Sequence, residues 1–192
     1  YEYFLYMRHL FAYEYASGIV TREHTVLDLG CGEGYGADIL SKCAKRVIAV
    51  DNNLESVEQT KKKYLADNLD FRHFSGMEIP FNNSVFDVVV SFQVIEHISD
   101  DAKFISEVYR VLKDGGKCIL TTPNRVYRLR SGQKPWYRYH VREYDISEFE
   151  SLLRGRFRDV EVKYINTTEE LFKMEERVVK VASLVQKLDP LK

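Results

Sequence analysis

Short apolar runs alternate along this chain with amphipathic segments and with turns that contain glycine or proline. Runs rich in valine, isoleucine and leucine predict strands at 26–29, 46–51, 69–74, 86–92, 117–122 and 159–165. Apolar residues at helical spacing predict helices between them, at 34–43, from 54 onward, at 100–112 and at 146–153. Strands that alternate with helices predict a parallel sheet with right-handed crossovers, and therefore an α/β domain.

The sequence also offers candidate helix caps and predicts a helix near each end. Asn53 and Ser99 directly precede two of the predicted helices as N-cap candidates, and Ser147 gives a capping signal at the start of the helix at 146–153. Residues 2–20 predict a leading helix with an aromatic face made of Phe4, Met7, Phe11 and Tyr15. Residues 168–187 predict an amphipathic helix at the other end.

The first predicted strand ends in an acid and then breaks into glycines at every second position. This segment reads Val26-Leu27-Asp28-Leu29-Gly30-Cys31-Gly32-Glu33-Gly34. Glycine permits positive φ and lets a ligand approach the backbone where no Cβ intervenes. The next strand ends at Asp51, where a carboxylate can accept both hydroxyls of a ribose. The pattern predicts a site for a nucleoside-bearing cofactor.

The glycine spacing argues against a nicotinamide cofactor. The dinucleotide fingerprint requires G-x-G-x-x-G. Here the glycines fall at positions 30, 32, 34 and 36, and Tyr35 occupies the place of the third glycine. A turn that binds nothing is the plainer alternative, and the two strand-end acids argue against it.

The order D-x-G-x-G-x-G followed by a strand-end Asp resembles the class I S-adenosylmethionine-dependent methyltransferases. The segment 94–98 (VIEHI) resembles ubiquinone-type O-methyltransferases, and 110–116 resembles their RVLKPGG turn, with Asp114 in place of proline. The segment 140–144 (HVREY) resembles methyltransferases of cell-surface polysaccharide clusters. The resemblance implies a Rossmann-like, doubly wound, mostly parallel sheet with helices on both faces. The sequence offers no convincing match to the family's final antiparallel strand.

The resemblance also implies S-adenosyl-L-methionine as the cofactor and S-adenosyl-L-homocysteine as the product. Asp28 is expected to hold the turn or the amino group of the cofactor. Asp51 is expected to accept the ribose hydroxyls, and Asn52 is expected to lie beside the adenine. Ser75 stands where many relatives carry an Asp that accepts from the adenine amino group. The full expected contact set is Asp28, Gly30, Cys31, Gly32, Gly34, Asp51, Asn52, Ser75, Gly76, Met77, Ser91, Phe92 and Gln93.

Glu96, His97 and His140 are the candidate catalytic residues. In ubiquinone-type and small-RNA 2′-O-methyltransferases, an E-x-x-E-H cluster with a distant His can hold a divalent metal. Gln93 replaces the first Glu here, and a neutral amide is a weaker ligand for a hard cation, so we expect no tightly held metal. His97 is then a candidate general base. In the alternative interpretation, Glu96 caps the next helix and His97 only orders a loop.

The segment 124–143 is rich in basic and aromatic residues and has no acid before Glu143. Its basic residues are Arg125, Arg128, Arg130, Lys134, Arg138 and Arg142, and its rings include Tyr127, Trp136, Tyr137 and Tyr139. Guanidinium groups bind carboxylates and phosphates, and aromatic rings stack on sugars. We therefore expect Arg138, His140 and Arg142 to bind an anionic acceptor such as a uronic acid, a sugar phosphate or a lipid-linked glycan. The alternative is a solvated basic loop that pairs with acids elsewhere.

Composition narrows the picture further. The formal net charge of −1 gives no general attraction to nucleic acid or to an anionic membrane. Three widely spaced cysteines without a C-x-x-C pair argue against a disulfide framework or a zinc site. No apolar run approaches the length of a membrane span, so we expect a cytoplasmic enzyme.

The length of 192 residues favours a single methyltransferase domain. We divide it into a leading helix at 1–20, a cofactor-binding core at 21–123, an acceptor loop at 124–143 and a C-terminal part at 144–192. The expected activity is O-methylation of an anionic small-molecule or glycan acceptor. Two alternatives remain open, namely an RNA ribose 2′-O-methyltransferase and a non-catalytic cofactor-binding subunit.

Overall fold

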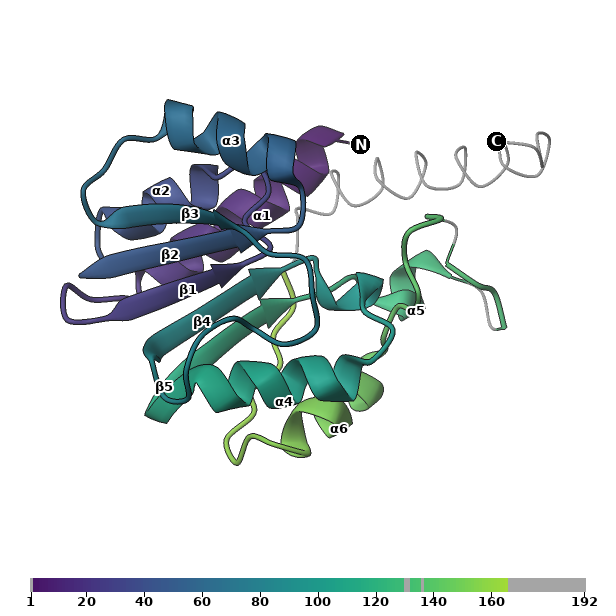
Figure 1. Cartoon of the computed structure of the whole chain (residues 1–192). Helices are drawn as coiled ribbons and strands as arrows, with labels where there is room; N and C mark the ends of the chain where they lie inside the picture. Colours follow the sequence, from purple (N-terminus) through teal and green to yellow (C-terminus); the bar gives the residue numbers. More distant parts are fainter. Residues whose placement is uncertain (1, 130–131, 136, 166–192) are drawn as a thin grey trace.

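A computed structural model describes residues 2–129, 132–135 and 137–165 of the chain. Its centre is a parallel sheet with the strand order β3-β2-β1-β4-β5 (Figure 1). The strands are β1 (Thr25–Leu29), β2 (Arg46–Asp51), β3 (Leu69–His73), β4 (Phe86–Phe92) and β5 (Leu112–Thr121). The order reverses direction between β1 and β4, and α/β proteins bind ligands beside the strand ends at such a switch point.

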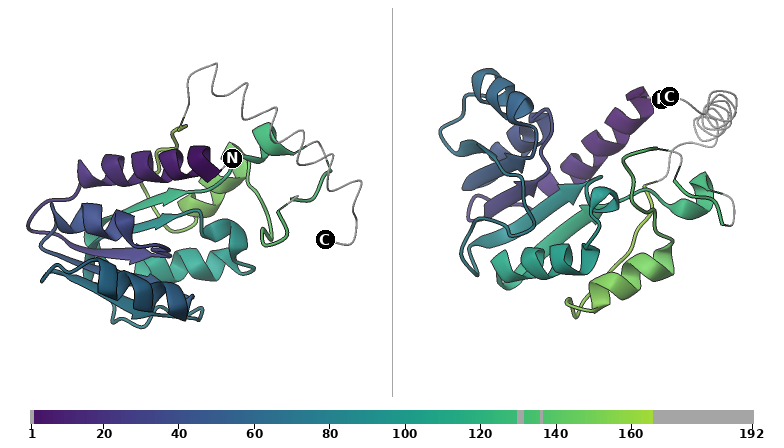
Figure 2. Two further views of the ribbon diagram at one scale, coloured as in Figure 1. Left: turned by 90° about the horizontal axis from the view of Figure 1, so that it is seen from above. Right: turned by 45° about the vertical axis from the view of Figure 1, so that its right-hand side comes forward.

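Helices cover both faces of this sheet, as the sequence predicted (Figure 2). The elements on one face are α1 (Glu2–Ser17), α2 (Tyr35–Ser41) and α3 (Leu54–Lys63), which pack on Val26, Val47 and Val88. The elements on the other face are α4 (Asp101–Val111) and α6 (Ile146–Arg154), which pack on Leu27, Ile48 and Val89. Successive strand residues point to opposite faces, so one apolar run supplies both cores.

Several predicted boundaries are confirmed and two predicted caps are wrong. β2 and β4 have the predicted bounds, and the Asn53 side chain accepts a hydrogen bond from the Ser56 amide at 3.0 Å. The cap of α4 is Asp100, which accepts from the Lys103 amide at 3.0 Å, and not Ser99. The cap of α6 is Asp145 rather than Ser147, because Asp145 and Glu148 form a reciprocal capping box.

Both ends of the described chain differ from the prediction. In α1 the residues Met7, Phe11 and Tyr15 are exposed, whereas Ala12, Tyr13 and Ala16 face the sheet. The Tyr13 ring packs over Gly36 of α2, where the missing Cβ makes room for it. Residues 159–165 form no strand, and the predicted helix at 168–187 lies outside the described residues.

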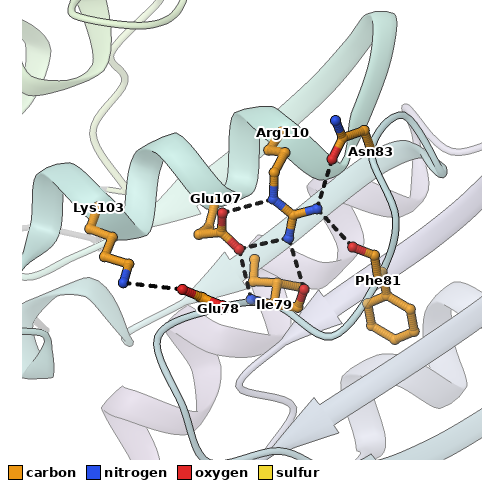
Figure 3. Close-up of polar contacts among 7 residues, drawn as sticks. All are labelled: Glu78, Ile79, Phe81, Asn83, Lys103, Glu107 and Arg110. Carbon is orange, nitrogen blue, oxygen red and sulfur yellow. Dashed lines mark hydrogen bonds and ion pairs between the residues drawn. The ribbon is translucent and has the colours of Figure 1, made fainter.

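Arg110 on α4 fixes the connection between β3 and β4 (Figure 3). Its guanidinium donates to the carbonyls of Ile79 and Phe81 at 2.8 Å each, and to Asn83 at 3.1 Å. It also forms an ion pair with Glu107 at 2.6 Å, and Glu107 in turn accepts from the Ile79 amide at 2.9 Å. One side chain thereby fastens the loop that follows Ser75, Gly76 and Met77.

Across the described part of the chain, no helix combines the length and the apolar character that a bilayer crossing requires.

Candidate active site

The glycine turn after β1 forms an open cradle above the end of the sheet. Gly30, Gly32 and Gly34 have φ values of 91°, 51° and 76°, a region that favours glycine. A Cβ on Gly30 would lie 2.3 Å from Val94, and one on Gly34 would lie 2.8 Å from Thr60. A Cβ on Gly32 would meet no atom within 4 Å, so the space beside this residue is open. The outer glycines allow close packing, and the central one leaves room for a ligand.

Asp51 at the end of β2 braces this cradle. Its Oδ2 accepts a hydrogen bond from the Gly32 amide at 2.8 Å, and its Oδ1 accepts from the Asn53 amide at 2.9 Å. A carboxylate has about four lone-pair directions, so both oxygens keep acceptor capacity for a ribose diol. The structure thus brings Asp51 and the glycine turn together, as the sequence predicted.

Asp28 lies buried beneath the turn, and Tyr13 of α1 covers it. The Tyr13 hydroxyl lies 3.2 Å from Oδ1 and 3.1 Å from Oδ2 of Asp28. Burial raises the pKa of Asp28 to about 7, against the Tyr13 hydrogen bond, which lowers it. The ring of Tyr13 occupies the space that a Cβ on Gly36 would need, at 2.0 Å. Gly36 therefore serves helix packing, which explains a fourth glycine in the series.

The other expected cofactor residues occupy three kinds of position. Cys31 is buried in the turn, and Asn52, Ser75, Gly76 and Met77 follow the ends of β2 and β3. The Ser91 hydroxyl is buried and donates to the Leu29 carbonyl at 2.7 Å, so it joins β4 to β1. Phe92 packs edge-on against Tyr13, with ring centroids 4.7 Å apart.

Gln93 ends β4 in an unusual conformation. Its φ of 56° lies in the left-handed region, which costs a non-glycine residue about 1 kcal/mol. Its side-chain Nε2 donates to the Thr121 hydroxyl at the end of β5, at 3.1 Å. Strained residues of this kind concentrate at functional sites because the surrounding structure holds them in place.

Glu96 lies within a single turn of 3₁₀ helix, Ile95–His97, directly after β4. The side chain is fully buried, and burial raises the pKa of Glu96 to about 7. Its Oε2 accepts from the Thr122 hydroxyl at 3.2 Å, whereas Oε1 has no hydrogen-bond partner among the described residues. Since Asp100 caps α4, the interpretation of Glu96 as the cap of that helix is wrong.

His97 and His140 meet beside Glu96, although 43 positions separate them. Their rings lie edge to face with centroids 4.8 Å apart. His97 Nδ1 donates to the Tyr139 carbonyl at 2.9 Å, and His140 Nδ1 pairs with Glu143 at 2.8 Å. Glu143 is buried and also accepts from Arg128 at 3.1 Å. Both rings therefore use Nδ1 for support, which leaves Nε2 available for chemistry.

The segment 124–143 includes the short helix α5 (Arg125–Arg128) and folds back onto this cluster. Several of its basic residues bind acids of the fold, as the solvated-loop alternative proposed. Arg125 pairs with Asp145 at 2.6 Å, Arg128 with Glu143, and Arg142 with Asp101 at 2.6 Å. Arg138 instead lies over the Tyr139 ring, 4.4 Å from its centroid. Arg130 and Trp136 lie outside the described residues.

Comparison with known proteins agrees with this geometry. A family model described as a methyltransferase domain matches residues 27–120. A probable S-adenosylmethionine-dependent methyltransferase of Mycolicibacterium smegmatis is 41% identical over 136 residues, which cover 71% of this chain and 52% of that protein.

The chain belongs to the class I S-adenosylmethionine-dependent methyltransferases.

The uncharacterized methyltransferase YcgJ of Bacillus subtilis is 30% identical over 145 residues, covering 68% of this chain and 55% of that protein. A YcgJ crystal structure shares the fold, with a TM-score of 0.66 and 21% identity over 89% of this chain and 82% of that one. The chain spans about half the length of the curated relatives it matches. As in the family, S-adenosyl-L-methionine is the cofactor of this methyltransferase domain.

Tyr13 and Glu143 contact candidate site residues, and the sequence patterns did not single them out. Tyr13 covers Asp28 from 15 positions away, and Glu143 orients His140. Glu143 carries a usable signal, since an acid three residues after a candidate histidine invites a test for pairing. Tyr13 carries none, because its partner depends on how α1 lies across the sheet.

Proposed function

We propose that the protein transfers the methyl group of S-adenosyl-L-methionine to an oxygen of an anionic small-molecule or glycan acceptor. The observation that carries this proposal is the attachment of the 137–142 segment beside the cofactor turn. The Val141 amide donates to the Glu96 carbonyl at 2.8 Å, and His97 holds the Tyr139 carbonyl. A segment fastened at both points brings Arg138 and His140 to the end of β4.

The cofactor end of the proposal rests on the cradle. The open space beside Gly32 would admit the methionine portion, and Asp51 would accept the ribose hydroxyls. Asp28 would hold the amino group, since an acid beneath the turn favours a cation. The loop with Ser75 and Met77 follows β3 and would lie beside the adenine. Each of these roles is testable by substitution.

The acceptor end rests on the segment 124–143 and on a groove beside it. The groove runs along β5 and its walls include Gln93, Thr122, Asn124, Tyr127 and Arg128. Arg138 and Tyr139 supply a cation over an aromatic ring in the part of the segment that contacts His97. A guanidinium that is stacked on a ring still presents its edge to a carboxylate or phosphate. We assign Arg142 a supporting role in this proposal, because it forms an ion pair with Asp101 at 2.6 Å.

Methyl transfer from a sulfonium is an in-line displacement in which the acceptor oxygen attacks the methyl carbon and the thioether sulfur leaves. Alignment of the three atoms supplies a large share of the acceleration. A hydroxyl acceptor must also lose its proton, and a group with a suitable proton affinity must lie within reach. Glu96, His97 and His140 lie together at this end of the sheet and are the residues proposed to activate the hydroxyl.

The test measures binding first and transfer second. Calorimetry should show S-adenosyl-L-homocysteine bound and NAD not bound. Transfer of a labelled methyl group should then favour glucuronic acid or glucose 6-phosphate over glucose. Arg138→Glu should raise the acceptor KM at least tenfold, while Arg138→Lys should have a smaller effect and cofactor affinity should stay unchanged. Equal transfer to the neutral sugar would contradict an anionic acceptor.

A further inference from the structure

Gln93 is held in its strained conformation from both sides. In the described part of the chain, it and Ser84 are the non-glycine residues with positive φ, at 56° and 57°. Val94, the next residue, packs against the glycine turn, where the missing Cβ of Gly30 makes room for its side chain. On the other side, the Gln93 backbone amide donates to the Thr121 carbonyl at 3.0 Å. Contacts on both sides therefore fix a backbone conformation that a non-glycine residue disfavours.

This conformation directs the Gln93 side chain toward β5. Its Nε2 donates to the Thr121 hydroxyl at 3.1 Å, and β5 lies on the opposite side of β4 from β1 and the glycine turn. Val94 takes the position against Gly30 instead. Gln93 also lines the groove that runs along β5. The contacts of its side chain therefore lie on the acceptor side of the site.

A carboxamide at this place suits a hydroxyl that keeps its proton. Its oxygen can accept two hydrogen bonds, and its nitrogen has a second N–H besides the one given to Thr121. A neutral amide does not take up a proton, so it cannot activate the hydroxyl that reacts. It is also uncharged, so it does not repel an anionic acceptor as a carboxylate at position 93 would.

We propose that Gln93 binds the methyl acceptor by a hydrogen bond to a second hydroxyl, which lies beside the one that is methylated. The acceptor is then a compound with at least two neighbouring hydroxyls. This proposal rests on the proposed function and deepens it, because it adds a neutral contact to the cation that Arg138 supplies. Gln93 orients the acceptor, and Thr121 is a positioning residue that acts through Gln93.

The experiment compares Gln93→Ala with Gln93→Gly, each saturated with S-adenosyl-L-homocysteine. Ligand-observed NMR measures the affinity for glucuronic acid and for glucose. Both variants lack the carboxamide, so both should weaken sugar binding about fivefold or more. Gln93→Gly should nevertheless melt at a higher temperature than Gln93→Ala, because glycine adopts positive φ without strain. This pair separates the loss of the side chain from the strain of the backbone.

Two further variants complete the comparison. Thr121→Val removes the hydroxyl partner of the carboxamide and should weaken sugar binding by a smaller factor than Gln93→Ala. Ser84→Gly is the matched control, because it relieves the same kind of backbone strain before β4 begins, at the opposite end of the strand from Gln93. It should leave the sugar affinity unchanged.

Cofactor affinity separates the two roles that Gln93 can have. S-adenosyl-L-homocysteine should bind to Gln93→Ala within about twofold of the wild-type affinity. A larger loss, without the same loss in Ser84→Gly, would make Gln93 a cofactor contact and would overturn the proposal. Wild-type sugar affinity in Gln93→Ala would also overturn it, and the methyltransferase assignment would then stand unchanged.

The proposed function would fail in a different way. Wild-type protein that binds glucose as tightly as glucuronic acid would contradict an anionic acceptor, and the role of Gln93 would then be read from the loss of glucose affinity. Wild-type protein that binds neither sugar would overturn both proposals.

Discussion

The Asp28 carboxyl is fully buried, and its ionisation depends on the groups that lie beside it in the turn. Burial raises the pKa of Asp28 to about 7, so the ligand-free protein holds a proton there that an exposed carboxyl would lose. The unfolded value is 3.8, so the folded chain binds the extra proton. The stability of the ligand-free protein therefore falls as the pH rises from the unfolded value through about 7.

Binding of the cofactor should favour the ionised form of Asp28, because the positively charged amino group of the cofactor would lie beside this carboxylate. We expect the affinity for S-adenosyl-L-homocysteine to rise roughly tenfold as the pH increases by one unit or more through the Asp28 transition. Asp28→Asn should bind weakly and with little pH dependence, and Tyr13→Phe should move the transition to higher pH. Calorimetry across this pH range checks all three. An unchanged slope in Asp28→Asn would assign the dependence to another group.

Gly32 offers a second test of the cradle. Gly32→Ala places a methyl group in the open space and should weaken S-adenosyl-L-homocysteine binding at least tenfold. The backbone strain should cost about 1 kcal/mol of folding stability. Gly115→Ala is the matched control, since Gly115 also has a positive φ of 74° and open space around it but lies in the exposed first part of β5, away from the cradle. Equal loss of binding in both variants would indicate general destabilisation.

The helix α4 shows how an element on one side of the sheet positions a loop at its end. Arg110 and Glu107 hold four backbone groups or side chains of the β3–β4 connection at once. The guanidinium of Arg110 also lowers the pKa of Glu107. An arginine that serves several acceptors is hard to replace, because a lysine has no planar fork. This connection begins with the residues expected beside the adenine.

Loss of this arginine should therefore affect both stability and cofactor binding. Arg110→Ala removes the side-chain donor from two carbonyls and the cation from Glu107, and should cost about 1–3 kcal/mol of unfolding free energy. The affinity for S-adenosyl-L-homocysteine should fall several-fold, because the loop after Met77 loses its anchor. Thermal unfolding and calorimetry measure the two effects. Lys103→Ala is the control, because its 3.6 Å pair with Glu78 is exposed and should contribute little.

The accuracy of the predictions from sequence differs between elements for physical reasons. β2 is an apolar run between Arg46 and Asp51, and β4 is an apolar run interrupted only at Asp87 and Ser91, so both strands are visible in the sequence. The caps of α4 and α6 were misassigned because a serine and an aspartate lie close together at the start of each helix. The sequence does not show which of the two side chains accepts from the amide three residues further on. The predicted strand at 159–165 has alternating apolar residues but no strand pairing in the structure.

Contacts between distant residues explain most of what the sequence left open in the candidate site. The glycine turn and Asp51 are local to strand ends, so spacing alone places them together. The pairs Tyr13–Asp28 and Arg142–Asp101 join residues 15 and 41 positions apart. No periodicity relates such positions. Counting charges in the 124–143 segment therefore overestimated the number of cations available to a ligand.

Across the whole molecule, the 124–143 segment links the acceptor side of the site to α4. Asp101 at the start of α4 accepts from Arg142 at 2.6 Å and from the Tyr144 hydroxyl at 2.9 Å. The two contacts hold the end of the segment near His140. Arg138 has no such task, although both arginines belong to the same sequence element. We propose that Arg142 supports the segment and that Arg138 binds the acceptor.

This division predicts different consequences for two charge reversals. Arg142→Glu should place a second carboxylate beside Asp101 and lower the unfolding free energy by about 1–3 kcal/mol. It should also reduce kcat, because the segment that carries His140 loses this contact. Arg138→Glu should leave the melting temperature within a degree or two and act on the acceptor KM. Differential scanning fluorimetry and steady-state kinetics separate the two outcomes. Equal thermal losses would show that Arg138 also supports the segment.

The contact of α1 with the acid beneath the glycine turn has a practical consequence for anyone who shortens this protein. A version that starts just before β1 would keep the whole glycine motif, yet water would enter above Asp28 and the ring that fills the space over Gly36 would be gone. Such a truncation would still match the methyltransferase family in sequence, although it would lack α1 and the Tyr13 side chain that covers Asp28. Motif boundaries and functional boundaries do not coincide in this molecule.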